Sequence, residues 1–232
     1  SVQCAGRLVA RGIDALVIAC NTASAVALPA LAAAYPDLPV VGVVEPGAAA
    51  AVAATRSGHV AVIATEGTVR GGAYARAIER RRPGTRVTSV ACPLFVALAE
   101  EGWTEGPIVA AVARRYLEPV FAASDAPDTL VLGCTHFPVF AATLRDAVGP
   151  GVAIVDSAAT TAAAVAALRA TPAGRGGSDS AVRDAGHGRL RLLATDGPER
   201  FARVSATFGI AVAPGDVELV DLAQPPAAAG TS

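Results

Sequence analysis

Two cysteines follow apolar runs in closely similar sequence settings. The segment LVIACNTAS, residues 16–24, carries Cys20, and the segment LVLGCTHFP, residues 130–138, carries Cys134. Each cysteine ends a predicted buried strand, and each is followed by small polar residues and a helix-like segment. A thiol with an ordinary pKa of about 8.5 can exchange a proton near neutral pH. The matched pair therefore indicates acid–base chemistry carried out by two thiols.

Two thiols that face one cavity from opposite sides suit the inversion of a carbon centre. One thiolate removes a proton from the carbon while the other thiol donates a proton to the far face. This chemistry requires no cofactor. The chain contains no lysine, because all 19 basic residues are arginine, so it cannot form the Schiff base that pyridoxal phosphate needs. Burial as structural thiols is the alternative reading, but the matched settings favour function.

The surrounding pattern predicts an α/β fold with mostly parallel sheets. The strand-like runs are continuously apolar rather than alternating, which indicates burial on both faces beneath covering helices. Strands are expected at 14–19, 38–44, 59–64, 86–91, 129–133, 152–156 and 189–195. Helices are expected at 23–34, 67–82, 106–123, 137–148, 157–169 and 198–208.

Both cysteines therefore fall where ligands bind in an open α/β sheet, beyond the carboxyl ends of strands. A helix beginning at that position offers unpaired N–H groups and a partial positive charge. These favour a thiolate and also hold a carboxylate. Each predicted site thus combines a reactive sulfur with a place for an anion.

The composition excludes several other classes of function. A formal net charge of −1 gives no electrostatic footprint for nucleic acid or an anionic membrane. The apolar stretches are interrupted too early to span a bilayer, and no secretory leader opens the chain, so we expect a cytoplasmic protein. Cys4, Cys20, Cys92 and Cys134 form no CxxC pair, and no spacing of ligands predicts a metal site.

Further motifs lie between and after the two cysteine segments in a characteristic order. They are GVVEPGA (42–48), ATEGT (64–68), ACPLFVALAEEG (91–102) and ATDGPERFARVSATFG (194–209). With ACNTAS and GCTHFP, these motifs resemble glutamate racemase, within the wider aspartate/glutamate racemase superfamily. The resemblance runs from about residue 1 to about residue 222.

The resemblance implies cofactor-independent interconversion of L- and D-glutamate, which supplies D-glutamate for peptidoglycan. It implies Cys20 and Cys134 as the acid–base thiols, assisted by His136 and Glu100. The residues it implies for substrate binding are Asn21, Thr22, Thr65, Thr68, Thr135 and His136. Thr68 as a helix cap and Glu100 as a solvated helix end are the plain alternatives.

Two pseudo-symmetric α/β lobes are also implied, with the active site in the cleft between them. The expected first lobe comprises residues 1–44 and 157–232, and the second comprises residues 45–156. Family members commonly form homodimers, so a homodimer is among the expectations. The family's opening strand–helix–strand segment has no counterpart here, and we expect that it is lacking.

Three alternatives stay open at this stage. The chain could act on aspartate or a related acidic amino acid, because one sequence does not reveal the size of the pocket. It could also be a truncated, inactive domain that binds acidic amino acids or partners. Outside the motifs, His59 and His187 are expected at the surface, Cys4 and Cys92 as structural thiols, and 171–188 and 223–232 as a loop and a disordered tail.

Overall fold

The computed structural model describes residues 1–170 and 189–222. The chain divides into a smaller unit, Ser1–Ile13 with Gly176–Ser232, and a larger unit, Asp14–Arg175. The predicted loop at 171–188, with His187, and the predicted tail at 223–232 lie outside the described residues. All the predicted site residues belong to the larger unit.

A four-stranded parallel sheet forms the centre of the larger unit, in the order β4-β3-β5-β6. The strands are β3 (His59–Ala64), β4 (Arg86–Ala91), β5 (Thr129–Gly133) and β6 (Ala153–Asp156). The two inner strands, β3 and β5, are buried along their whole length. The α/β class and the parallel pairing predicted from the continuous apolar runs are thereby confirmed.

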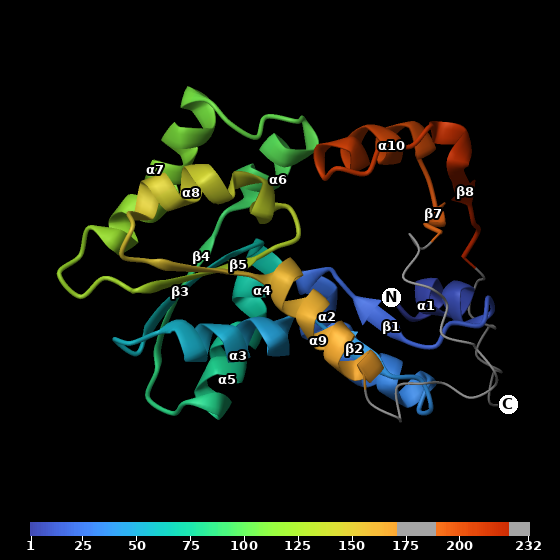
Figure 1. The fold of residues 1–232 in the computed structure, drawn as a ribbon, viewed down its shortest axis with the longest axis horizontal. Helices are drawn as coiled ribbons and strands as arrows, with labels where there is room; N and C mark the ends of the chain where they lie inside the picture. Colours follow the sequence, from blue (N-terminus) through green and yellow to red (C-terminus); the bar gives the residue numbers. More distant parts are fainter. Residues whose placement is uncertain (171–188, 223–232) are drawn as a thin grey trace, which may run out of the picture. The chain divides into compact units, whose positions relative to one another are not determined.

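Helices cover both faces of this sheet (Figure 1). Helices α3 (Val44–Ala54) and α5 (Ala73–Arg81) lie on one face, and α7 (Pro107–Phe121) and α8 (Ala141–Val148) lie on the other. Alternate residues of β3 pack toward α3 and α5, because successive side chains of a strand point to opposite faces. On the opposite face the rings of Phe95, Phe137 and Phe140 form an aromatic cluster.

The helices differ from the sequence prediction at three places. The single helix expected at 67–82 is two helices, α4 (Glu66–Gly71) and α5, because the chain turns at Gly72 with a φ of 60° that favours glycine. Helices α3 and α6 (Pro93–Glu100) were not predicted. Both follow a strand almost directly and have few polar residues, so they show little of the periodicity that identifies a helix.

A second, two-stranded parallel sheet of the larger unit carries the first cysteine segment. Strand β1 (Leu16–Ile18) pairs with β2 (Val40–Gly42). Helix α2 (Asn21–Ala34) connects the two strands, and α9 (Ser157–Ala170) packs against β2. Both predicted strands and both predicted helices are confirmed, with shorter strands than expected.

The smaller unit contains a two-stranded parallel sheet of β7 (Leu192–Ala194) and β8 (Val217–Leu219). Its helices are α1 (Val2–Val9), α10 (Pro198–Thr207) and the short 3-10 helix η3 (Pro214–Asp216). An ion pair between Arg11 and Glu218 joins the two segments of this unit. The predicted assignment of residues 1–44 and 157–232 to one lobe and 45–156 to another stays a prediction.

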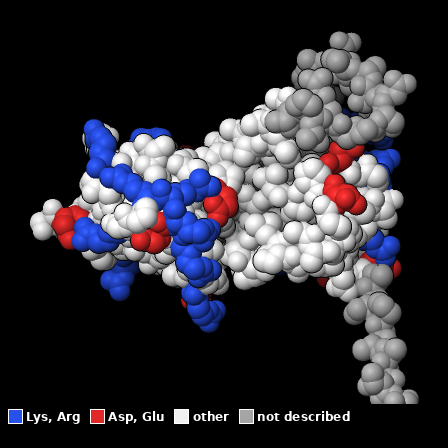
Figure 2. Space-filling model, turned by 90° about the horizontal axis from the view of Figure 1, so that it is seen from below, with Lys and Arg blue, Asp and Glu red and all other residues white. Residues whose placement is uncertain are grey.

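Charge is unevenly distributed on the surface of the larger unit. Figure 2 shows basic side chains gathered on the face seen from below, over the region of α5. Arg80 and Arg81 of α5 bind the carboxylate of Glu45 on α3 at 2.5 and 2.8 Å. Within the described part of the chain, no helix combines the length and the apolar composition that a membrane span requires.

Candidate active site

Cys20 lies at the junction between β1 and α2. It is the N-cap residue of α2, in extended backbone conformation, and its side chain is exposed. The prediction that this cysteine stands directly before a helix is confirmed. An N-terminal position places a thiolate near the positive end of the helix dipole, which stabilises its charge.

The two residues after Cys20 connect α2 to the larger sheet's helices. Asn21 is 2% exposed, and its Oδ1 accepts a hydrogen bond of 2.7 Å from the hydroxyl of Tyr74. The hydroxyl of Thr22 lies 2.8 Å from that of Thr65 and 3.1 Å from that of Thr68. The predicted site residues of α2 and α4 are therefore brought together in space.

The three threonine hydroxyls form a closed triangle, because Thr65 and Thr68 also lie 3.1 Å apart. Thr65 is the N-cap of α4 and accepts a bond from the backbone N–H of Thr68. The plain alternative, that Thr68 caps a helix beginning near 69, is wrong: the helix begins at Glu66 and Thr65 caps it. The three hydroxyls lie close enough together that they could donate hydrogen bonds to one anion.

Cys134 follows the last residue of β5, as predicted, and is buried. Burial raises the pKa of its thiol, and the nearby charge of Cys20 adds to the rise. The backbone N–H groups of His136 and Thr135 oppose that effect by favouring the thiolate. The helix that follows begins only at Phe137, as the 3-10 helix η1 (Phe137–Phe140), so Cys134 is no N-cap residue. The helix therefore begins three residues after the cysteine, and the backbone N–H groups that favour its thiolate belong to the intervening turn.

His136 and Glu100 lie beside the second thiol, as expected. The His136 Nδ1 is 3.6 Å from the Sγ of Cys134, and its Nε2 is 3.2 Å from Oε1 of Glu100. Glu100 is the last residue of α6 and is part-buried, so it is not the fully solvated helix end of the alternative reading. Thr135 is exposed, with its hydroxyl 3.5 Å from the same Nδ1. The thiol of Cys134 thus contacts an imidazole, and that imidazole contacts a carboxylate.

The two cysteines lie close enough in space that the charge of Cys20 raises the pKa of Cys134. Cys92, which precedes α6, is a third thiol in this neighbourhood. It is fully buried, and burial together with the charge of Cys134 raises its pKa to about 12. A thiol with so high a pKa stays protonated near neutral pH, which agrees with its predicted structural role. Cys4, by contrast, is exposed on α1.

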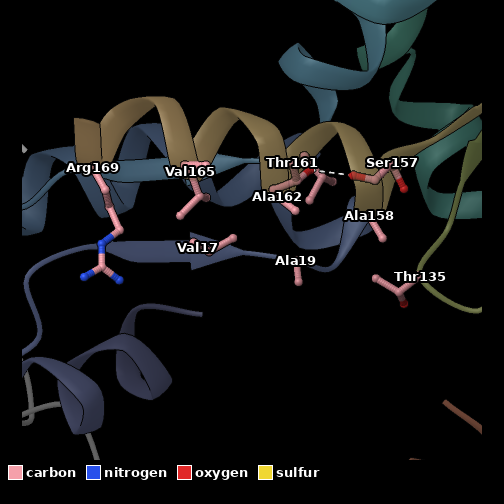
Figure 3. Close-up of a pocket in the computed structure, with 11 residues that line it drawn as sticks. Val17, Ala19, Thr135, Ser157, Ala158, Thr161, Ala162, Val165 and Arg169 are labelled. Atoms are coloured by element: carbon pink, nitrogen blue, oxygen red, sulfur yellow. Dashed lines mark hydrogen bonds between the residues drawn. The ribbon is translucent and has the colours of Figure 1, made fainter. Parts of the chain in front are cut away.

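An apolar groove of about 500 Å³ adjoins this cluster (Figure 3). Val17 of β1 and Ala19, just after that strand, form one side, and α9 forms the other, with Arg169 at one end and Thr135 at the opposite end. Neither cysteine lines the groove, and its walls are mostly apolar. The groove is therefore too apolar to be the main site for a charged substrate. The polar cluster begins at the end of the groove marked by Ala19 and Thr135.

Sequence reasoning missed two polar residues that contact this cluster. Tyr74 of α5 binds Asn21 and also Ser157, the first residue of α9. No motif distinguishes either residue, because their contacts join segments that are far apart in the chain. His59, expected at the surface, is buried at the start of β3, where it contacts the backbone carbonyl of Asp125 at 2.8 Å and Thr88 at 2.8 Å.

The site offers no cluster of metal ligands. Across residues 1–170 and 189–222, no group of three or more His, Cys, Asp or Glu side chains could hold a metal ion. The polar groups of the site are instead thiols, hydroxyls, amides and one imidazole–carboxylate pair. These groups can bind an anion and move protons.

Comparison with known proteins relates this arrangement to one enzyme family. Residues 2–165 match the family model described as Asp/Glu/Hydantoin racemase. A glutamate racemase of Geobacter metallireducens is 47% identical over 208 residues, which cover 90% of this chain and 74% of that protein.

Solved structures give the same relation. The glutamate racemase isoform RacE1 of Bacillus anthracis superposes with a TM-score of 0.82 at 30% identity, covering 95% of this chain and 78% of that chain. A glutamate racemase of Francisella tularensis, crystallised with D-glutamate, gives a TM-score of 0.81 at 28% identity over 95% and 78% of the two chains.

Proposed function

Because this chain belongs to the Asp/Glu/Hydantoin racemase family, we propose that it interconverts L- and D-glutamate with Cys20 and Cys134 as its two acid–base groups. One observation carries the mechanism: the two cysteines end strands of different sheets, yet the charge of one shifts the pKa of the other. The substrate follows from the family members that are similar to this chain, which are named as glutamate racemases.

The proposed reaction moves one proton on each side of the α-carbon. A thiolate on one side removes the α-proton, and the electron pair of the broken C–H bond passes onto the α-carbon and its carboxylate. The thiol on the other side then donates its proton to the opposite face. The carbon is inverted, and the two cysteines have exchanged their protonation states. Atoms and charge balance without a cofactor.

The neighbours of Cys134 support its role in this exchange. Burial keeps its thiol protonated, which suits a proton donor, and makes the thiolate a stronger base once it forms. His136 can accept the thiol proton at Nδ1 while Glu100 holds Nε2–H. A base held by a third group in this way activates the group it contacts.

Substrate binding is assigned to the polar groups around the two thiols. The hydroxyls of Thr22, Thr65 and Thr68 and the amide of Asn21 would hold the substrate's carboxylate. Thr135, which is exposed beside His136, would contact its polar groups from the other side. Donors fixed in advance on separate elements bind an anion with little reordering.

The proposal extends to the place of the reaction in the cell. D-glutamate made in the cytoplasm would be supplied for peptidoglycan synthesis. A racemase for aspartate or a related acidic amino acid is the nearest alternative. The non-enzymatic alternative is an inactive domain that binds acidic amino acids.

Exchange of the α-proton in deuterated water separates these functions. L-glutamate, D-glutamate and both enantiomers of aspartate are incubated with the protein, and deuterium at Cα is followed by NMR. We expect deuterium in glutamate from either enantiomer, with net inversion. The variant Cys4→Ser loses an exposed thiol of the smaller unit and should exchange glutamate as the wild type does.

The other outcomes of this experiment are equally distinct. Deuterium that enters aspartate alone would make the protein an aspartate racemase. The absence of exchange with all four amino acids, combined with measurable binding of one of them, would make it a binding domain.

A further inference from the structure

A buried tyrosine on α5 contacts the residue that follows Cys20. Tyr74 is 2% exposed, and its hydroxyl donates to Oδ1 of Asn21 at 2.7 Å. The hydroxyl of Ser157 is a second hydrogen-bond partner of Tyr74. Burial raises the pKa of Tyr74 well above its ordinary value, so its hydroxyl keeps its proton and stays a donor.

The amide of Asn21 is satisfied on one side only. Its oxygen is occupied by Tyr74, whereas its Nδ2 is buried without a hydrogen-bond partner among the described residues. Buried polar groups are almost always paired, because an unpaired donor loses its hydration without compensation. An unpaired N–H group directly after the first thiol therefore indicates an acceptor supplied by a ligand.

Two glycines make the space that the tyrosine ring occupies. A Cβ placed on Gly47 would lie 3.1 Å from the ring and hydroxyl of Tyr74, and one on Gly133 would lie 3.1 Å from the ring's other edge. Gly47 belongs to the EPGA motif, and Gly133 immediately precedes Cys134. The ring is thus held between α3 and the strand that leads to the second thiol.

We propose that Tyr74 is a positioning residue, which fixes the amide of Asn21 so that Nδ2 presents its hydrogen atoms to the substrate's carboxylate. The Tyr74 hydroxyl donates its single hydrogen atom to Oδ1 of Asn21, which leaves Nδ2 as the end of the amide that is not bonded within the protein. An amide turned the other way would present its oxygen to the carboxylate, and the two would repel each other. This inference depends on the proposed function, because it takes an amino-acid carboxylate as the ligand.

The variant Tyr74→Phe removes the hydroxyl and keeps the ring between the two glycines. We expect KM for L- and D-glutamate to rise about tenfold, with kcat changed less than about threefold, because the amide contacts ground state and transition state alike. The matched control is Tyr116→Phe, which removes a hydroxyl that accepts a hydrogen bond from the backbone N–H of Leu94 at 3.3 Å. It should leave both constants unchanged.

A second comparison tests whether Tyr74 acts through Asn21. In an Asn21→Ala background, adding Tyr74→Phe should cause no further rise in KM, because the amide to be oriented is gone. An unchanged KM in Tyr74→Phe would overturn the inference. So would a further tenfold rise in the double variant, since the tyrosine would then act by another route.

An additional readout does not depend on turnover. In the ligand-free protein, the Asn21 side-chain amide signals in ¹H–¹⁵N spectra should shift and broaden in Tyr74→Phe and not in Tyr116→Phe. Unchanged Asn21 signals would contradict the inference even if KM changed. If the wild type exchanges no glutamate, the proposed function fails, while the amide signals still decide whether Tyr74 orients Asn21. A purely structural role would lower the melting temperature of Tyr74→Phe and leave KM and the amide signals unaltered.

Discussion

At the scale of single residues, the second thiol is set apart from the first by its surroundings. Cys134 is buried and touches His136, which in turn touches Glu100, whereas Cys20 is exposed at the start of α2. All of these residues belong to the motifs from which the candidate site was predicted. The sequence could not show that burial dominates the pKa of Cys134, because the covering elements come from distant parts of the chain.

Replacing His136 tests the contact with Cys134. We expect His136→Gln to lower kcat/KM by about 10²- to 10⁴-fold, the usual contribution of a positioned acid or base. The loss should be equal in both directions, because the two enantiomers have equal free energy. Racemisation is followed by circular dichroism from each enantiomer.

The control for this variant is His59→Gln at the start of β3, remote from the two thiols in sequence and bonded to Thr88 and Asp125. Its kcat/KM should stay close to the wild-type value at temperatures where it is folded. A His136→Gln enzyme with wild-type kcat/KM would remove the imidazole from the proposed proton transfer.

At the scale of elements, the inner strands were the easiest to predict and the short helices the hardest. Strands β3 and β5 are continuous apolar runs bounded by turn residues, and their ranges agree closely with the sequence prediction. Helix α3 was missed because EPGAAAAVAA combines a proline with a nearly uniform run of alanine. Such a run has no polar face to mark a helical period.

Glycine at the end of β5 is required by close packing against the neighbouring strand. A Cβ on Gly133 would lie 2.9 Å from the backbone oxygen of Ile63, which cannot move without displacing β3. We expect Gly133→Ala to lower the free energy of unfolding by about 1–3 kcal/mol, the usual cost of overpacking a core. Chemical denaturation measures the loss.

The control is Gly151→Ala, since a Cβ there meets nothing within 4 Å. It should change the free energy of unfolding by less than about 0.5 kcal/mol. Equal stability of Gly133→Ala and the wild type would show that β3 and β5 can separate locally, contrary to the packing described above.

At the scale of the whole molecule, all the site residues belong to the larger unit, including those contributed by its two separate sheets. The family could be predicted from motifs, since each motif is contiguous, and the same motifs supply the proposed acid–base residues. The contacts of Tyr74 with Asn21 and Ser157 could not be predicted, because they depend on how α5, α2 and α9 pack together.

Global stability should depend on pH through Asp128, which joins the turn after α3 to the start of β5. Burial opposes its charge, but hydrogen bonds from Thr55 and the backbone N–H groups of Ser57 and Arg56 hold its pKa below the ordinary value. Because the folded pKa is the lower one, this stabilisation is complete above about pH 4 and is lost as the pH falls further.

Asp128→Asn should therefore lower the free energy of unfolding by about 1–3 kcal/mol at pH 7, and the difference from wild type should shrink below about pH 4. Urea denaturation at a series of pH values gives both quantities. Asp37→Asn, on an exposed turn, serves as the control and should change neither. A difference that stays constant down to pH 2.5 would contradict the proposed charge of Asp128.

The most direct measurement follows the α-proton in the two single-cysteine variants. Cys20→Ser and Cys134→Ser are each incubated with L- and D-glutamate in deuterated water. Because the thiols act on opposite faces of the α-carbon, each variant should lose net inversion, and any exchange that persists should favour opposite enantiomers in the two variants. Net inversion by either variant, or persistent exchange of the same enantiomer by both, would contradict a two-thiol reaction.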